Sequence, residues 1–277
     1  MAERIRRART PFRAETRHPA AVRLLTVAEF GELQPLRWRL VLEGDELGPF
    51  DRDGRSGPEA RSSGFDDVVI LCFPDPATGD PGLPRVAATG GLGAPPGVTV
   101  RAREYTVRAW DAAARRTTID LVRHDEGEAE TWLRRARPGD RLGVIAPRVS
   151  RGLPAAHELL AIGDATALPA LERLLEELPR HARGAVVLAA PRRGLGIAAA
   201  APEGVRVRHV DLADPSARAL IPHLEPLLPA PDRGFAWLAG ESALVADLRR
   251  WLVAERGLPK ARVQFTGYWR RGVVAGH

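Results

Sequence analysis

The stretch Arg103-Glu104-Tyr105-Thr106-Val107-Arg108 is the most informative in this chain of 277 residues. β-Branched and aromatic residues continue from it to Trp110, and a loop rich in glycine and proline that ends in Pro95-Pro96-Gly97 precedes it. These features predict a β-strand with a turn before it. On its own, the hexapeptide is compatible with an exposed barrel strand whose polar residues alternate with apolar ones.

The same residues are arranged as a flavin site would require. A strand that opens with Arg103 can offer a cation to a pyrophosphate. Tyr105 can lay its phenol ring along an isoalloxazine, and Thr106 can offer a hydroxyl or an amide to flavin N5. The hexapeptide alone favours a flavin-binding strand and an ordinary barrel strand about equally.

Short predicted strands separated by turns fill the first half of the chain. The strands cover residues 21–27, 36–43, 68–73, 103–110, 117–123 and 141–145, and a short helix is predicted at 129–136. Residues 44–64 are polar and are predicted to be a mobile loop. Residues 75–97, rich in Gly and Pro, are predicted to be either an ordered excursion or a disordered flap. This pattern predicts an antiparallel barrel.

Strands and helices alternate from about residue 152 onward. Predicted strands at 158–162, 185–190, 205–210, 234–239 and 262–266 enclose predicted helices at 166–178, 215–228 and 242–256. The alternation predicts a doubly wound parallel sheet with helices packed over it. We therefore expect two domains, residues 1–152 and residues 153–277.

The composition is that of a globular protein. Hydrophobic residues make up 44% and charged residues 27% of the chain, and no run of about 18 apolar residues suggests a membrane span. Cys72 is the single cysteine, which excludes internal disulfides, iron–sulfur clusters and cysteine-based zinc sites. This cysteine usage favours the cytoplasm, where thiols stay reduced. The arginine-rich N-terminal residues have no apolar core, so they do not form a secretory signal.

The basic charge does not indicate a nucleic-acid-binding protein, although the net charge is +6. The arginines are spread along the chain, Lys260 is the sole lysine, and aromatic residues make up only 5%. A basic surface also suits an anionic substrate or NADPH. We expect no nucleic-acid partner and no membrane partner, and no metal site, since the histidines show no ligand spacing.

Three motifs in this order resemble the siderophore-interacting proteins, a branch of the ferredoxin-reductase-like flavoproteins. They are the hexapeptide at 103–108, Gly163-Asp164-Ala165-Thr166-Ala167-Leu168-Pro169-Ala170, and Gly267-Tyr268-Trp269-Arg270-Arg271-Gly272. Residues 65–74, 136–141 and 240–241 also look like family segments. The resemblance implies an antiparallel Greek-key FAD-binding barrel followed by a doubly wound parallel-sheet NAD(P)H-binding domain.

The resemblance implies an FAD site on the barrel. Its expected contacts on the strand are Arg103, Tyr105, Thr106 and Val107. Its expected contacts in the following diphosphate loop are His124, Gly127, Ala129, Glu130 and Thr131.

The diphosphate loop departs from the family's pattern at Asp125, Glu128 and Glu130. Each acidic side chain close to a diphosphate repels it by about 1 kcal/mol when exposed, and by more when buried. Binding of FAD therefore requires these carboxylates to point outward.

The pyridine-nucleotide site is expected at the carboxyl ends of the parallel strands. Asp164 and Thr166 can cap the helix that follows, whose N-terminus offers free N–H groups to a phosphate. The alternative is a cap that binds nothing. Arg192 and Arg193 follow the second strand, where arginine accommodates a 2′-phosphate and so favours NADPH over NADH, unless they form a solvated basic loop. Glu241, which closes a late strand, is the remaining expected contact of this site.

The expected substrate contacts are Arg270, which matches the family's C-terminal arginine, and Arg148 after Pro147. Arg270 is equally compatible with a plain surface charge. Val68 and Ile70 stand where the family more often has His and Lys, so a cation that would serve an anionic siderophore is absent.

These features together predict a flavin-dependent oxidoreductase that uses FAD and NADPH to reduce a ferric siderophore or ferric chelate, without a catalytic side-chain acid or base. One alternative is a non-catalytic accessory protein with this fold, suggested by the acidic diphosphate loop. Another is a flavin reductase with a different acceptor, suggested by the missing lysine. We expect a monomer in the cytoplasm.

Overall fold

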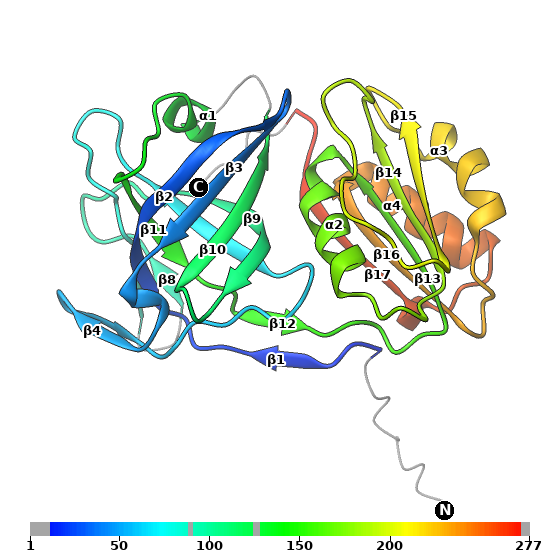
Figure 1. Ribbon diagram of the computed structural model, residues 1–277, viewed down its shortest axis with the longest axis horizontal. Coiled ribbons are helices and arrows are strands. Elements are labelled where there is room, and N and C mark those ends of the chain that lie inside the picture. The colour runs from blue at the N-terminus through cyan, green and yellow to red at the C-terminus, as the bar shows by residue number, and fades with distance from the viewer. Residues whose placement is uncertain (1–11, 88–90, 124–127, 273–277) are drawn as a thin grey trace, which may run out of the picture.

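The computed structural model describes residues 12–87, 91–123 and 128–272. A closed antiparallel barrel and a five-stranded parallel sheet lie side by side (Figure 1). The predicted fold class is therefore confirmed. Within the described ranges, no helix is long and apolar enough to cross a membrane.

The barrel closes in the strand order β10-β3-β2-β11-β6-β9, and every neighbouring pair is antiparallel. Its strands are β2 (Val22–Gln34), β3 (Arg37–Glu43), β6 (Val68–Phe73), β9 (Arg101–Asp111), β10 (Arg116–Val122) and β11 (Arg141–Ile145). Alternating apolar residues such as Leu40, Leu42, Ile119 and Leu121 fill the interior and are almost completely buried. This alternation is the pattern of a strand with one face in a core.

Short elements decorate the barrel. They are β1 (Glu15–Arg17) paired with β12 (Val149–Arg151), β4 (Phe50–Arg52) paired with β5 (Arg55–Gly57), β7 (Arg85–Val86) paired with β8 (Leu92–Gly93), a 3-10 turn (Asp45–Leu47) and the helix α1 (Glu128–Leu133). Residues 44–64 thus contain a hairpin and a turn, which the polar composition did not predict. Arg55 and Glu46 pair with one another at 2.6 Å and hold this segment to the barrel, because Arg55 NH1 donates to Val22 O at 3.2 Å and Glu46 Oε2 accepts from Leu24 N at 2.7 Å.

The parallel sheet has the strand order β15-β14-β13-β16-β17. Its strands are β13 (Glu158–Asp164), β14 (Gly184–Ala190), β15 (Val205–Asp211), β16 (Gly234–Glu241) and β17 (Val263–Trp269). All eight residues of the interior strand β16 are buried, as expected for a strand covered on both faces. The order reverses between β13 and β16, which is where such sheets bind ligands.

Helices cover both faces of the sheet, so it is doubly wound. The helix α2 (Leu168–Glu177) packs on the face that carries Leu159 and Ala161. The helices α3 (Ala217–Leu224) and α4 (Ser242–Arg250) pack on the face that carries Leu160 and Ile162, and α4 continues into a π-helical turn. Figure 1 shows α2 between the sheet and the barrel.

Arg13, a buried residue of the N-terminal segment, forms hydrogen bonds with both domains. Arg13 is 4% exposed, and its NH1 donates to Asp66 Oδ2 on the barrel side at 2.7 Å and to Gln264 Oε1 on β17 at 3.0 Å. Trp237 of β16 also donates to Asp66, at 3.0 Å. Phe65 packs edge-on against the Trp237 ring with centroids 5.3 Å apart. The relative placement of barrel and sheet therefore rests on buried, specific contacts.

Candidate functional site

The strand β9 presents its predicted flavin residues to two different surroundings. Successive side chains of a strand point to opposite faces. Tyr105 packs towards the barrel core and its ring lies 6.3 Å from that of Phe73. Thr106 points to the sheet, since its Oγ1 donates to the phenol oxygen of Tyr268 on β17 at 3.5 Å. The hexapeptide therefore forms part of the boundary between the two domains.

Aromatic rings and a cation surround Tyr105. The Phe73 ring lies between Tyr105 and Trp132 of α1, 5.6 Å from the latter. Burial raises the pKa of the Tyr105 phenol well above its ordinary value, against a smaller opposing effect of the Arg103 guanidinium. The phenol is therefore neutral at physiological pH. The charges of Arg103 and Glu130 both act on the Tyr105 phenol, so the structure brings two further expected flavin residues into the surroundings of Tyr105.

The Glu130 carboxylate points inward and is neutralised. Its residue is 4% exposed, and its Oε1 accepts from Arg123 NH2 at 3.1 Å and lies 3.4 Å from Arg134 Nε. The expectation that the acidic residues must point outward is therefore wrong for Glu130, because two guanidinium groups compensate its charge.

The remaining expected residues of the diphosphate loop are placed only in part. Ala129 and Thr131 lie in α1, and Thr131 is exposed. His124, Gly127 and Asp125 lie outside the described residues.

Val107 belongs to the barrel core. Its side chain is fully buried, its N–H donates to Asp67 O at 2.9 Å, and its carbonyl accepts from Arg173 NH1 at 3.0 Å. The expectation that Val107 contacts the cofactor does not fit this geometry, since its side chain and both backbone groups are already occupied by protein.

Asp164 ties three strands together at the carboxyl edge of the sheet. Its Oδ1 accepts from the backbone N–H of Thr166 at 2.8 Å and from the Thr166 hydroxyl at 2.6 Å. Its Oδ2 accepts from Glu241 N at 2.7 Å and from the Trp269 indole at 2.8 Å. Gly240 has φ 140 and lies so close that a Cβ there would stand 2.6 Å from this carboxylate. The capping alternative for Asp164 and Thr166 is thus realised, and the Thr166 N–H is not free for a phosphate.

Glu241 caps the helix α4 in the same way. Its Oε2 accepts from Ala243 N at 2.7 Å and from Leu244 N at 2.9 Å, and its Oε1 accepts from Arg271 N at 3.3 Å. Burial acts to raise the pKa of Glu241, but the hydrogen bonds outweigh it and lower the pKa below its ordinary value. The ionised Glu241 carboxylate lies at the positive end of α4 and accepts from the first N–H groups of that helix. Those N–H groups are therefore not free to bind a phosphate.

The C-terminal motif ends β17 beside the barrel. Burial raises the pKa of the Tyr268 phenol, so the hydroxyl that meets Thr106 is neutral. Trp269 is 41% exposed. Arg270 is exposed and has no ion-pair partner among the described residues, whereas Arg271 pairs with Asp214 at 2.8 Å. Tyr268 was not expected as a site residue, although its motif was noted.

Arg192 and Arg193 lie on the same edge of the sheet, directly after β14. Both side chains are exposed. The Arg192 N–H donates to Asp211 Oδ1 at 2.8 Å, which fixes the backbone where the loop leaves the strand. Arg192 NH2 also donates to His209 O at 3.4 Å, and both guanidinium groups remain accessible to an anion at the carboxyl edge.

Arg148 lies between β11 and β12. It directly precedes β12, and its carbonyl accepts from His18 N at 2.9 Å. A contact of Arg148 with the substrate stays a prediction.

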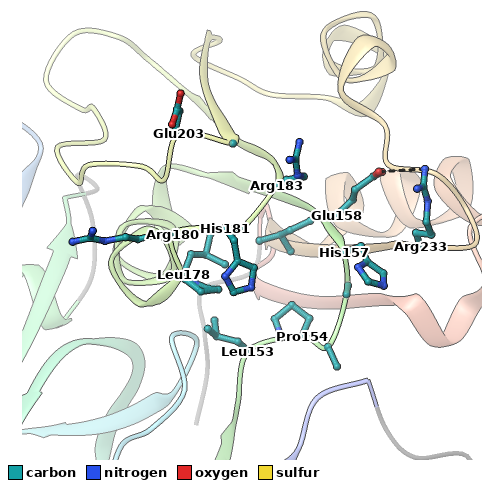
Figure 2. Close-up of a pocket in the computed structure, with 16 residues that line it drawn as sticks. Leu153, Pro154, His157, Glu158, Leu178, Arg180, His181, Arg183, Glu203 and Arg233 are labelled. Carbon is teal, nitrogen blue, oxygen red and sulfur yellow. Dashed lines mark ion pairs between the residues drawn. The ribbon is translucent and has the colours of Figure 1, made fainter.

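A cavity of about 1330 Å³ lies at the opposite edge of the sheet (Figure 2). It is lined by residues that precede or begin the strands, among them His157, Glu158, Arg183 and Arg233. Sheets of this kind bind ligands at the carboxyl ends, so this cavity is separate from the site around Asp164. The described ranges contain no group of His, Cys, Asp and Glu side chains that could hold a metal ion.

The barrel carries an aromatic and cationic strand and meets the carboxyl edge of the parallel sheet. This arrangement defines a two-domain flavoprotein. Residues 26–151 match the model of the siderophore-interacting FAD-binding domain, and residues 156–272 match that of the siderophore-interacting protein. The chain belongs to the siderophore-interacting protein family, its barrel is that family's FAD-binding domain, and FAD is its cofactor.

Known proteins resemble the chain over most of its length. The crystal structure of a siderophore utilization protein from T. fusca superposes with a TM-score of 0.83 at 35% identity, covering 96% of this chain and 98% of that one. The NADPH-dependent ferric-chelate reductase of Escherichia coli K12 is 29% identical over 257 residues, 91% of this chain and 94% of the relative. The ferric vibriobactin reductase ViuB of Vibrio cholerae is 31% identical over 177 residues, 61% of this chain and 65% of the relative.

The residues on the barrel fit a flavin dinucleotide. Tyr105 and its aromatic neighbours supply an apolar surface for a ring system. Arg123 and Arg134 lie around the buried carboxylate of Glu130, and Arg103 acts on the neighbouring Tyr105, so positive charge prevails among these charged side chains. A net cationic surrounding suits the diphosphate of FAD.

Proposed function

We propose that the chain reduces ferric siderophores or other ferric chelates with NADPH, by way of FAD, and so releases ferrous iron. The observation that carries this proposal is the contact between Thr106 and Tyr268, because it joins the flavin strand to the carboxyl edge where a nucleotide binds. The names of the relatives from Escherichia coli and Vibrio cholerae support the same reaction. Residues 1–152 would form the FAD domain and residues 153–277 the NADPH domain.

Bound FAD supplies the redox chemistry, since a flavin takes a hydride from a nicotinamide and can pass on single electrons. The protein's part is to bind and orient. Tyr105 would offer its neutral phenol ring to the isoalloxazine, Thr106 would offer its hydroxyl to the flavin, and Arg103 would offer its charge to the diphosphate. No side-chain acid or base is required.

Arg192 and Arg193 would select NADPH over NADH. They are exposed at the carboxyl edge, and Asp211 holds the backbone of Arg192 in place. A guanidinium pair matches the geometry and charge of a 2′-phosphate, whereas NADH offers only a hydroxyl at that position.

Arg270 would contact the ferric chelate. It is exposed at the end of β17, two residues after Tyr268. The strand β6 offers no cation beside the flavin strand, because Val68 lies opposite Thr106 and Ile70 opposite Glu104 in the register. The substrate side of the flavin is therefore less positive than in relatives with lysine there, which favours chelates of low charge.

A steady-state assay tests the proposal. Purified protein, FAD and ferric citrate are mixed with NADPH in the presence of a ferrous-specific chromogenic chelator. Appearance of the ferrous complex, dependent on both FAD and NADPH, is the expected result. FAD binding without ferric reduction would favour a flavin reductase with another acceptor. Absence of FAD binding would favour an accessory protein, and either outcome would refute the proposed reaction.

A further inference from the structure

Glu172 of α2 lies at the buried contact between the two domains and is 1% exposed. Its Oε2 accepts hydrogen bonds from two barrel residues, Arg37 and, at 3.2 Å, Arg108. Its Oε1 accepts from the backbone N–H of Ala198 at 2.9 Å. One carboxylate therefore joins the barrel, the helix α2 and the loop that carries Arg192 and Arg193.

The charges around Glu172 balance one another. The barrel supplies Arg37, Arg39, Arg108 and Asp120, and α2 supplies Glu172 and Glu176. Arg37 and Asp120 are 1% and 2% exposed, so water does not replace a missing partner. A buried charge that loses its partner is strongly unfavourable. Glu172 is therefore held in one position by groups that belong to the other domain.

The loop between β14 and β15 is held to the sheet at Arg192, whose N–H donates to Asp211 Oδ1, and to the barrel and α2 in its later part. Besides the Ala198 contact, the Gly194 carbonyl accepts from Leu36 N at 3.4 Å, and Gln34 Nε2 donates to Gly196 O at 3.5 Å. Gly194 has φ 83, and a Cβ there would stand 3.1 Å from Pro35. The turn between β2 and β3 thus packs directly against the loop. In the first part of the loop, Arg192 and Arg193 are exposed to solvent.

We propose that Glu172 is a positioning residue for NADPH: through Ala198 it holds the loop against the barrel, in the placement that lets Arg192 and Arg193 meet the 2′-phosphate. The inference rests on the proposed function, because it takes these two arginines as the contact of NADPH. Since the anchor is shared with Arg37 and Arg108, preference for NADPH depends on the domain boundary and not on the sheet alone.

Ligand binding without turnover tests this role. The probes are adenosine 2′,5′-bisphosphate and 5′-AMP, and calorimetry on the FAD-loaded protein gives the ratio of their dissociation constants. We expect the wild type to prefer the 2′-phosphate probe, and Glu172→Gln to reduce that preference about tenfold, as small misplacements of binding groups do. Hydrogen exchange of residues 191–201 should accelerate in the variant, and FAD content should stay unchanged.

A matched control is available on the same helix. Glu176 also pairs with Arg108 across the boundary, at 2.7 Å, but it is half exposed and makes no hydrogen bond or ion pair with the loop among the described residues. Glu176→Gln should therefore keep the wild-type preference. If Glu172→Gln does not fold, Ala198→Pro removes the N–H donor and leaves the buried charges intact, and it should show the same loss.

The outcomes separate the two proposals. A wild type without preference for the 2′-phosphate probe refutes the assignment of Arg192 and Arg193, and with it this inference. A wild type that has the preference, with folded Glu172→Gln or Ala198→Pro protein that keeps it, refutes the positioning role of Glu172 alone.

Discussion

The hydroxyl of Thr106 on β9 and the phenol oxygen of Tyr268 on β17 lie 3.5 Å apart, across the boundary of the two domains. The two residues are 162 positions apart in the chain. Their contact means that the strand expected to carry a flavin and the edge expected to receive a nucleotide share one site. Substitutions at these two positions should therefore separate a role at the cofactor from a role in domain contact.

Thr106→Val removes the hydroxyl and keeps the shape of the side chain. We expect FAD content to be unchanged and the rate of flavin reduction by NADPH to fall roughly two- to tenfold, the effect of one hydrogen bond. Stopped-flow absorbance measures this rate. Tyr268→Phe is the matched control, since it breaks the same contact from the other side. An equal loss in both variants would assign Thr106 to domain contact instead.

The double variant Arg192→Ala/Arg193→Ala should lose its preference for NADPH. Two charge-assisted contacts to a 2′-phosphate contribute about 1.5–3 kcal/mol, which corresponds to roughly 10- to 150-fold in discrimination. Comparison of kcat/KM for NADPH and NADH in the wild type and the variant measures the change. Equal use of both nucleotides by the wild type would contradict this assignment.

Arg270→Ala should raise KM for anionic ferric chelates. The attraction grows with the charge of the ligand and is screened by salt, so the effect should be largest for highly charged chelates at low ionic strength. Initial rates with ferric citrate at two salt concentrations, against a neutral hydroxamate complex, measure it. An unchanged KM for every anionic chelate at low salt would make Arg270 a plain surface residue.

Removal of Arg37 should destabilise the whole protein. Arg37→Ala leaves Asp120 and Glu172 buried with reduced compensation, which costs about 3–5 kcal/mol of the free energy of unfolding. Urea denaturation followed by tryptophan fluorescence measures the loss. Arg61→Ala is the control, because its pair with Glu59 is exposed on both sides and should contribute less than about 1 kcal/mol. A loss no larger than that of Arg61→Ala would contradict the buried network.

The same network predicts sensitivity to acid. Burial acts to raise the pKa values of Asp120 and Glu172, but hydrogen bonds and charge outweigh it and lower both pKa values below their ordinary values, from Arg39 and Arg37 for Asp120 and from Arg37 for Glu172. The unfolded chain then binds more protons than the folded one as the pH falls through about 4. The stabilisation is therefore present above that pH and is lost below it, where the unfolding midpoint in urea should decline.

Much of the fold could be predicted because local patterns of apolar residues and turn residues specify its strands and helices. The expected strands 68–73 and 141–145 coincide with β6 and β11, since a short apolar run bounded by turn residues such as Gly, Asp and Pro marks each of them. The hairpin at 44–64 was missed, because its stability comes from Arg55 and Glu46 rather than from a local apolar pattern.

The candidate site was harder to predict than the fold. Asp164 and Glu241 are residue types that suit a ligand contact and a helix cap equally well, and only the geometry shows them as caps. Glu172 is 135 residues from Arg37 in the chain and stands within a helical run where a glutamate normally faces solvent. No local signal marks it, because its role arises only when the two domains meet.

The anaerobic visible spectrum of the FAD-loaded protein tests the central claim most directly. We expect the flavin bands to bleach on addition of NADPH and to return when a ferric chelate is added, while a ferrous-specific chelator develops its colour. A protein that takes up no FAD, or whose bleached flavin is not reoxidised by any ferric chelate, would contradict the account.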